Sequence, residues 1–281
     1  MADQRPTDSF PSLLDVGLYL TMHGYNWYWL AFVCMITSLL AIIVLDFMRP
    51  RGIRLFHQIA IVVLTTASLA YFSMAFDLST SSPEAQIGGG AAFRTISFAW
   101  YIMWIINLPL LLLSVLLVTG LSLLEILVTL FAAVVLVLSG LVADFAPAYG
   151  RWFSLMSGVA FGCVIHNVLV KGTKSAYAAG DAFGTRYLLS AAFLALVLLG
   201  YPATHVLAHS SALAPAAAAG AYGALDVLAQ PVFLLFFLHQ LSRIDPGSVC
   251  GAIALEDAEE AQQRPRPRRL RRSLPLVVLR Y

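Results

Sequence analysis

The chain has 281 residues, of which 60% are hydrophobic and 11% are charged, and its mean hydropathy is +0.82. A soluble domain carries about 25% charged residues, so this composition excludes an ordinary soluble protein and predicts a membrane protein. The formal net charge of +2 is too small to indicate a partner, and the spacing of Cys34, Cys163 and Cys250 predicts neither a metal site nor a disulfide framework.

A helix needs about 20 apolar residues to cross a bilayer. Seven stretches have this length, and turn-forming residues such as Pro50, Gly88 and Gly120 separate them. We predict helices over residues 27–48, 55–76, 92–118, 121–144, 151–170, 187–208 and 216–241. The polar start of the chain leads into no short apolar core with a cleavage site, so no cleaved signal peptide is expected. The first apolar stretch would itself direct insertion.

The positive charges predict the orientation, because Lys and Arg collect in cytoplasmic loops. Alternate connections and the tail hold most of them, and the opposite side holds only Arg5, Arg94 and Arg151. The N-terminus is therefore expected outside the cell and the C-terminus in the cytoplasm. We divide the chain into an extracellular segment (1–26), a seven-helix domain (27–243) and a disordered cytoplasmic tail (244–281).

The tail carries acidic residues at 256–260 and a run of six arginines between Arg264 and Arg272. The run can attract anionic lipid headgroups, or it can act as a solvated topology determinant, which is the reading we favour. It lacks interleaved aromatic residues, so no nucleic-acid partner is expected. The chain also lacks a G-x-S-x-G elbow, a Walker loop and a zinc-binding His-Glu-x-x-His motif. An enzyme is not expected.

Several motifs occur in a fixed order along the seven stretches. They are Ala70-Tyr71-Phe72 in the second, Trp100-Tyr101-Ile102-Met103-Trp104 in the third, Gly200-Tyr201-Pro202 in the sixth and Leu225-Asp226-Val227-Leu228-Ala229 in the seventh. Together these motifs resemble microbial rhodopsins between about residues 25 and 243. The match is nearest to the fungal opsin-related proteins that lack the retinal-binding lysine. The resemblance implies an all-α bundle of seven transmembrane helices.

The resemblance also shows what has changed. Gln230 takes the position of the lysine that binds retinal as a Schiff base, and an amide cannot form that bond. Met103 stands at the counter-ion position, Trp100 at that of the preceding arginine and Ser114 at that of the third-helix proton donor. Two pocket aromatics of the sixth helix are replaced by Leu198 and His205. The remaining, vestigial pocket is expected to comprise Tyr71, Met103, Trp104, Tyr201, His205, Asp226 and Gln230.

The two lysines of the chain are Lys171 and Lys174, both beside a predicted cytoplasmic loop. No lysine lies in the apolar core, so a relocated Schiff base is excluded as well. We therefore expect no cofactor and no covalently bound retinal. Noncovalent binding of retinal stays open.

Asp226 is the one carboxyl group expected near the middle of the membrane, where an ionisable residue is a functional candidate by default. The resemblance places Tyr71 and Tyr201 against it, and Gln230 lies one turn away on the same helix. The alternative, which we favour, is a structural network inherited from a photoactive ancestor. His205 can join this cluster or face the outer interface. The stripe of Trp100, Met103, Trp104 and Asn107 is a pocket wall or, in the favoured reading, core packing.

The expected protein is a non-photoactive, multi-pass membrane protein. By resemblance alone, it is expected in the plasma membrane with a stress-associated, chaperone-like or pump-regulating role. An ion or proton transporter that uses Asp226 is the alternative, and a retinal photoreceptor or light-driven pump is the least favoured. The lipid bilayer is the expected partner, and binding to other membrane proteins or to further copies of the chain is left open.

Overall fold

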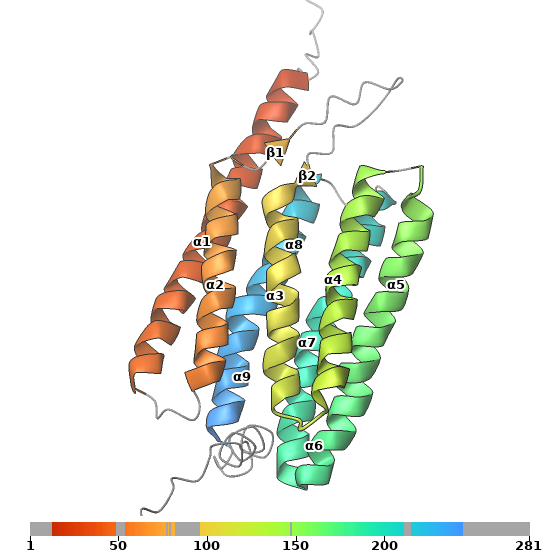
Figure 1. The fold of residues 1–281 in the computed structure, drawn as a ribbon. Coiled ribbons are helices and arrows are strands. Elements are labelled where there is room, and N and C mark those ends of the chain that lie inside the picture. Colours follow the sequence, from red (N-terminus) through yellow and green to blue (C-terminus); the bar gives the residue numbers. More distant parts are fainter. Residues whose placement is uncertain are drawn as a thin grey trace, which may run out of the picture.

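The structure is a computed structural model that describes residues 13–48, 54–76, 78, 80–81, 96–146, 148–210 and 215–243. Seven apolar helical spans run side by side in it and form one bundle (Figure 1). The first four are α1 (Leu13–Met48), α2 (Arg54–Ala75), α3 (Phe98–Leu117) and α4 (Leu123–Phe145). The fifth comprises α5 (Gly150–His166), the π-helical turn η2 (Asn167–Gly172) and α6 (Thr173–Ala179). The sixth is α7 (Asp181–His209), and the seventh comprises α8 (Pro215–Val227), the π-helical turn η3 (Leu228–Val232) and α9 (Phe233–Ser242).

The predicted seven-helix architecture is confirmed, and its boundaries need correction at three places. The third helix, predicted from residue 92, begins at Phe98, because Ile96 and Ser97 pair as a strand. Helix α1 begins at Leu13, inside the stretch expected to be an extracellular segment. The fifth span continues through α6, and α7 starts at Asp181, so Gly180 alone separates two helices where a long loop was expected. Gly180 has a φ of 147°, which glycine adopts without the steric cost that a side chain would add. The predicted tail 244–281 lies outside the described residues.

A two-residue antiparallel ribbon, β1 (Thr80–Ser81) with β2 (Ile96–Ser97), adds to the expected all-α fold. Thr80 pairs with Ser97, and Ser81 pairs with Ile96. The ribbon lies at the end of the bundle where α3 begins (Figure 1). It therefore fixes the chain beside the first turn of α3, the helix that supplies several site residues.

Helices dominate because a helix satisfies its own backbone hydrogen bonds where no water is available. The connection from α3 to α4 is as short as predicted: Gly120 takes a φ of 71° and Ser122 Oγ accepts the backbone N–H of Glu125 at 3.4 Å. That bond caps the start of α4. Pro109, Pro202 and Pro231 lie inside helical segments.

The bundle has a closely packed centre and an apolar outside. Met35, Leu64 and Leu112 are fully buried between helices. On the outer faces of α4 and α5, Leu124 and Trp152 are each 72% exposed. Large apolar side chains on the outside are costly in water but match the hydrocarbon of a bilayer. The distribution agrees with a multi-pass membrane protein.

Candidate functional site

The carboxyl group of Asp226 is completely buried in α8 and accepts four hydrogen bonds from three other helices. Its Oδ2 accepts from Tyr71 Oη at 2.5 Å and from Trp100 Nε1 at 2.9 Å. Its Oδ1 accepts from Tyr201 Oη at 2.6 Å and from Trp104 Nε1 at 3.2 Å. The two bonds expected from Tyr71 and Tyr201 are thus present. Asp226 ties α2, α3 and α7 to α8.

The sequence explains how one carboxyl group meets four donors. Trp100 and Trp104 are four residues apart, so both indoles lie on the same face of α3. Their rings are close to Tyr201, with a centroid distance of 5.0 Å from Trp104. Tyr222 joins the same aromatic group and lies 5.7 Å from Trp100. The carboxyl group is therefore surrounded by rings whose polar atoms point inward.

All four donors to Asp226 are uncharged, and no described residue forms an ion pair with it. An indole N–H only donates, whereas a tyrosine hydroxyl donates or accepts. The cluster can therefore accept either protonation state of the carboxyl group by turning one hydroxyl. Chemically, it holds and orients Asp226 without a positive charge.

Gln230 is also completely buried, and its side chain, which is one turn from Asp226 and within reach of it, bonds to α3 instead. Its Oε1 accepts from Asn107 Nδ2 at 3.0 Å, and its Nε2 donates to Met103 Sδ at 3.7 Å. The physical reason is that four donors already occupy the oxygens of Asp226, while the amide of Asn107 faces Gln230 from α3. The side chain at the presumed lysine position is thus fixed by α3.

Asn107 connects this amide pair to α2. Its Nδ2 also donates to the backbone carbonyl of Val63 at 3.1 Å. In both bonds the nitrogen of Asn107 donates to a carbonyl oxygen, so these two partners fix the orientation of the amide group. Its Oδ1 is buried and has no hydrogen-bond partner. One acceptor beside Gln230 is therefore left without a donor from the protein.

The structure brings together six of the seven residues of the expected vestigial pocket: Tyr71, Met103, Trp104, Tyr201, Asp226 and Gln230. His205 lies on α7, is half-buried and is not among the donors to Asp226. Reasoning from sequence missed two members, the donor Trp100 and the amide partner Asn107. Their shared face on α3 with Met103 and Trp104 was visible, but it was interpreted as core packing.

The other two substituted positions lie apart from these contacts. Ser114 is buried and donates to the backbone carbonyl of Leu111 at 2.7 Å. Leu198 is buried in the apolar core. No group of three or more His, Cys, Asp or Glu side chains that could hold a metal ion occurs within the described ranges.

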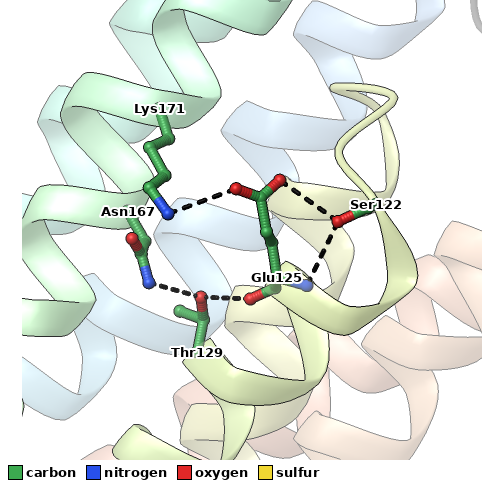
Figure 2. Close-up of polar contacts among 5 residues, drawn as sticks. All are labelled: Ser122, Glu125, Thr129, Asn167 and Lys171. Atoms are coloured by element: carbon green, nitrogen blue, oxygen red, sulfur yellow. Dashed lines mark hydrogen bonds and ion pairs between the residues drawn. The ribbon is translucent and has the colours of Figure 1, made fainter.

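Lys171 lies in η2 and is half exposed, with its Nζ 3.2 Å from Glu125 Oε1 (Figure 2). Glu125 also accepts from Ser122, at the start of α4. Next to this pair, Asn167 donates to Thr129 at 2.9 Å. The amine of Lys171 is thus engaged in an ion pair between α4 and η2. Lys174 follows one turn later in α6.

Comparison with known proteins agrees with this architecture. The family model of bacteriorhodopsin-like proteins matches residues 24–243. Protein FDD123 of Trametes versicolor is 44% identical over 233 residues, which cover 82% of this chain and 82% of the relative. The opsin-like protein carO of Fusarium fujikuroi is 29% identical over 252 residues, or 86% of this chain and 80% of the relative.

Solved structures of light-driven pumps have the same fold. The proton pump rhodopsin CsR of Coccomyxa subellipsoidea matches with a TM-score of 0.71 at 31% identity, over 77% of this chain and 96% of its own. Bromide-bound halorhodopsin of Halobacterium salinarum matches with a TM-score of 0.75 at 18% identity, over 83% and 99% of the two chains, and shares the fold alone. The matched range, the relatives and the seven spans agree, and the chain belongs to the bacteriorhodopsin-like family.

Proposed function

We propose that the protein works in the plasma membrane without covalently bound retinal, as a regulatory or chaperone-like partner of other membrane proteins such as ion pumps. The observation that carries the proposal is the buried amide pair of Gln230 and Asn107. A Schiff base requires a primary amine, and the two lysines of the chain, Lys171 and Lys174, both belong to the far end of the fifth span. Without retinal chemistry, the function we propose depends on the helix bundle and on the surfaces that it offers to other membrane proteins.

A light-driven pump also needs charged groups that exchange protons on both sides of a switchable centre. Here the residues next to the retinal position are neutral: Met103, Asn107 and Gln230. Asp226 is the carboxyl group of the centre, and its partners are two phenols and two indoles. This composition supports a centre that stabilises the bundle and argues against pumping.

The alternative, passive transport through Asp226, requires a polar path from this residue to both membrane surfaces. Beyond Gln230, the next turns of α3 and α9 present Leu111, Leu112, Phe233 and Leu234, each at most 1% exposed. From Gln230 to Leu238, before His239 and Gln240, the helix rises by about 12 Å. A close-packed apolar layer of this depth opposes the passage of hydrated ions.

The test compares proton transport in two preparations. In plasma-membrane vesicles from a fungal host, we expect the protein to change ATP-driven proton uptake, in darkness and without retinal. Asp226→Asn, checked for folding by its thermal melt, should retain this effect. In liposomes that contain the purified protein alone, we expect no proton flux. A flux that occurs with the purified protein and disappears in Asp226→Asn would contradict the proposal and favour transport.

A further inference from the structure

A polar residue is exposed on the outer side of the fifth span. Helix α5 lies at the edge of the bundle and packs mainly against α4 (Figure 1). Its buried side includes Ala160 and Val164, whereas His166 is exposed. Because His166 follows Val164 by two residues, it points about 200° around the helix from it, away from the bundle. The imidazole therefore faces the surroundings of the protein, which in a membrane are lipid chains.

The depth of His166 places it among the lipid chains and away from the headgroups. The next residue, Asn167, donates to Thr129 of α4 at 2.9 Å (Figure 2). Thr129 lies six residues beyond the start of α4 at Leu123, a rise of about 9 Å. On α5, the rise from Gly150 to His166 is about 24 Å. His166 is thus distant from both ends of the span and lies within the hydrocarbon layer, which is about 30 Å thick.

His166 has no hydrogen-bond or ion-pair partner within the part of the chain that the structure describes. Two other exposed polar side chains are satisfied within their own helices. Thr37 Oγ1 donates to the carbonyl of Val33 and Thr65 Oγ1 to that of Ile61, each at 2.7 Å. An imidazole without a partner is costly in hydrocarbon, because no water is present to take its hydrogen bonds. His166 therefore needs a polar partner from outside the chain.

The same face of α5 allows another helix to approach closely. Ser154, Gly158 and Gly162 precede His166 at intervals of four residues, and all four are exposed. A Cβ added to Gly158 or Gly162 would meet nothing within 4 Å. Small residues at this spacing let the backbones of two membrane helices come close together. The small residues thus permit the approach, and His166 offers a hydrogen bond that lipid chains cannot accept.

We infer that a second copy of the chain covers this face, and that the two α5 helices pack against each other in a parallel, two-fold symmetric dimer. Both copies insert with the same topology, so a two-fold axis along the membrane normal places the two His166 side chains at the same depth. A neutral imidazole carries one N–H donor and one acceptor nitrogen, so one His166 donates to the other. A helix of another protein would fit only with a polar group at this depth, a condition that a second copy meets by symmetry.

The experiment measures self-association of the purified full-length protein in phosphatidylcholine liposomes. Copies labelled at the C-terminus with a donor or an acceptor fluorophore are mixed, and energy transfer is followed as the ratio of protein to lipid falls. We expect wild type to show more transfer than unassociated proteins at the same density, and excess unlabelled protein should remove it. His166→Leu should weaken the dimer roughly three- to twentyfold, as expected for one hydrogen bond between membrane helices. His166→Asn keeps a donor and an acceptor and should retain most of the association.

A second variant tests the packing independently of the hydrogen bond. Gly158→Leu places a bulky side chain between the two helices, and nothing in its own bundle lies within 4 Å of the added Cβ. It should weaken the dimer at least as much as His166→Leu does. The matched control is Thr37→Leu, which changes an exposed polar residue of α1 whose hydroxyl bonds within its own helix. It should associate as wild type does.

Three results would contradict the dimer. Wild type that stays monomeric at the highest protein density would overturn the inference in favour of another occupant of this face. Association that is equal in wild type, His166→Leu and Gly158→Leu would show that the copies meet through a different face. An equal loss in Thr37→Leu and His166→Leu would show nonspecific association of crowded proteins. Thermal melts in dilute detergent check that each variant is folded.

Discussion

At the scale of single residues, the centre of the protein divides its polar groups between two separate partners. Asp226 takes the phenols and indoles, and Gln230 takes the amide of Asn107. A buried polar group is costly when it has no partner. The hydrogen bonds of Asp226 and Gln230 therefore hold in place the neighbouring helices that supply the donors.

The amide pair gives a direct stability prediction. Asn107→Leu removes the donor to both Gln230 and the carbonyl of Val63 and leaves buried acceptors unpaired. We expect it to lower the free energy of unfolding by about 0.6–1.7 kcal/mol, the range of hydrogen bonds between membrane helices. In the Asn107→Leu background, Gln230→Leu should recover part of this loss, since removing both partners leaves fewer unpaired groups. Denaturant unfolding in micelles measures both, and a further loss in the double variant would contradict the pairing.

The sequence predicted part of this centre for a clear physical reason. Asp226 is an isolated carboxyl group in an apolar stretch. Tyr71 and Tyr201 belong to motifs that resemble those of microbial rhodopsins, and the resemblance places both tyrosines beside Asp226. The partner of Gln230 could not be predicted, because spacing along one helix puts Asp226 within reach but gives no information about donors from α3. The indole of Trp100 was missed for a similar reason: helical spacing places a ring on a face without fixing where its N–H points.

At the scale of helices, the fifth span shows how one contact fixes a local irregularity. The π-helical turn η2 frees a backbone carbonyl at Val168, and the hydroxyl of Tyr187 on α7 donates to it. Gly172 makes the approach possible, since a Cβ added there would lie 2.0 Å from Tyr187 Oη. Tyr187 is 3% exposed, and the hydrogen bond to the Val168 carbonyl holds its hydroxyl beside Gly172.

A glycine pair tests this packing. Gly172→Ala should destabilise the protein by about 1–3 kcal/mol, the usual cost of overpacking. Gly162→Ala in α5 is the matched control, because nothing lies within 4 Å of a Cβ added there. It should be neutral or raise stability by about 0.5–1 kcal/mol through helix propensity. We expect Gly172→Ala to melt at a lower temperature than Gly162→Ala. Equal melting temperatures would show that the contact with Tyr187 is absent.

The positions of the spans followed from apolar length, but the extents of α1 and α6 did not. Hydropathy locates residues that avoid water, and it does not mark where a helix ends at the membrane surface. Residues 171–179 are polar enough to suggest a loop, yet they continue the helix until Gly180. The ribbon of β1 and β2 was missed because two-residue strands carry no periodic pattern.

At the scale of the whole molecule, the protein keeps the fold of a light-driven pump and lacks an amine in its core. Its bundle matches rhodopsin CsR over 77% of the chain, while both lysines belong to the end of the fifth span. Gln230 and Met103 contact each other where the resemblance places a lysine and its counter-ion. The lysine and counter-ion positions are thus filled by two neutral side chains that contact each other, and the apolar outside holds the bundle in the bilayer.

The most direct test is to express the protein with all-trans retinal, purify it in detergent and record its visible absorption. Borohydride reduction and mass spectrometry then search for retinyl adducts. As a positive control for the fold, Gln230→Lys combined with Met103→Asp restores an amine and a counter-ion and should bind retinal covalently at position 230. For the unaltered chain we predict no visible band that survives purification and no retinyl adduct. A stable visible pigment with retinal attached to Lys171 or Lys174 would contradict the central claim.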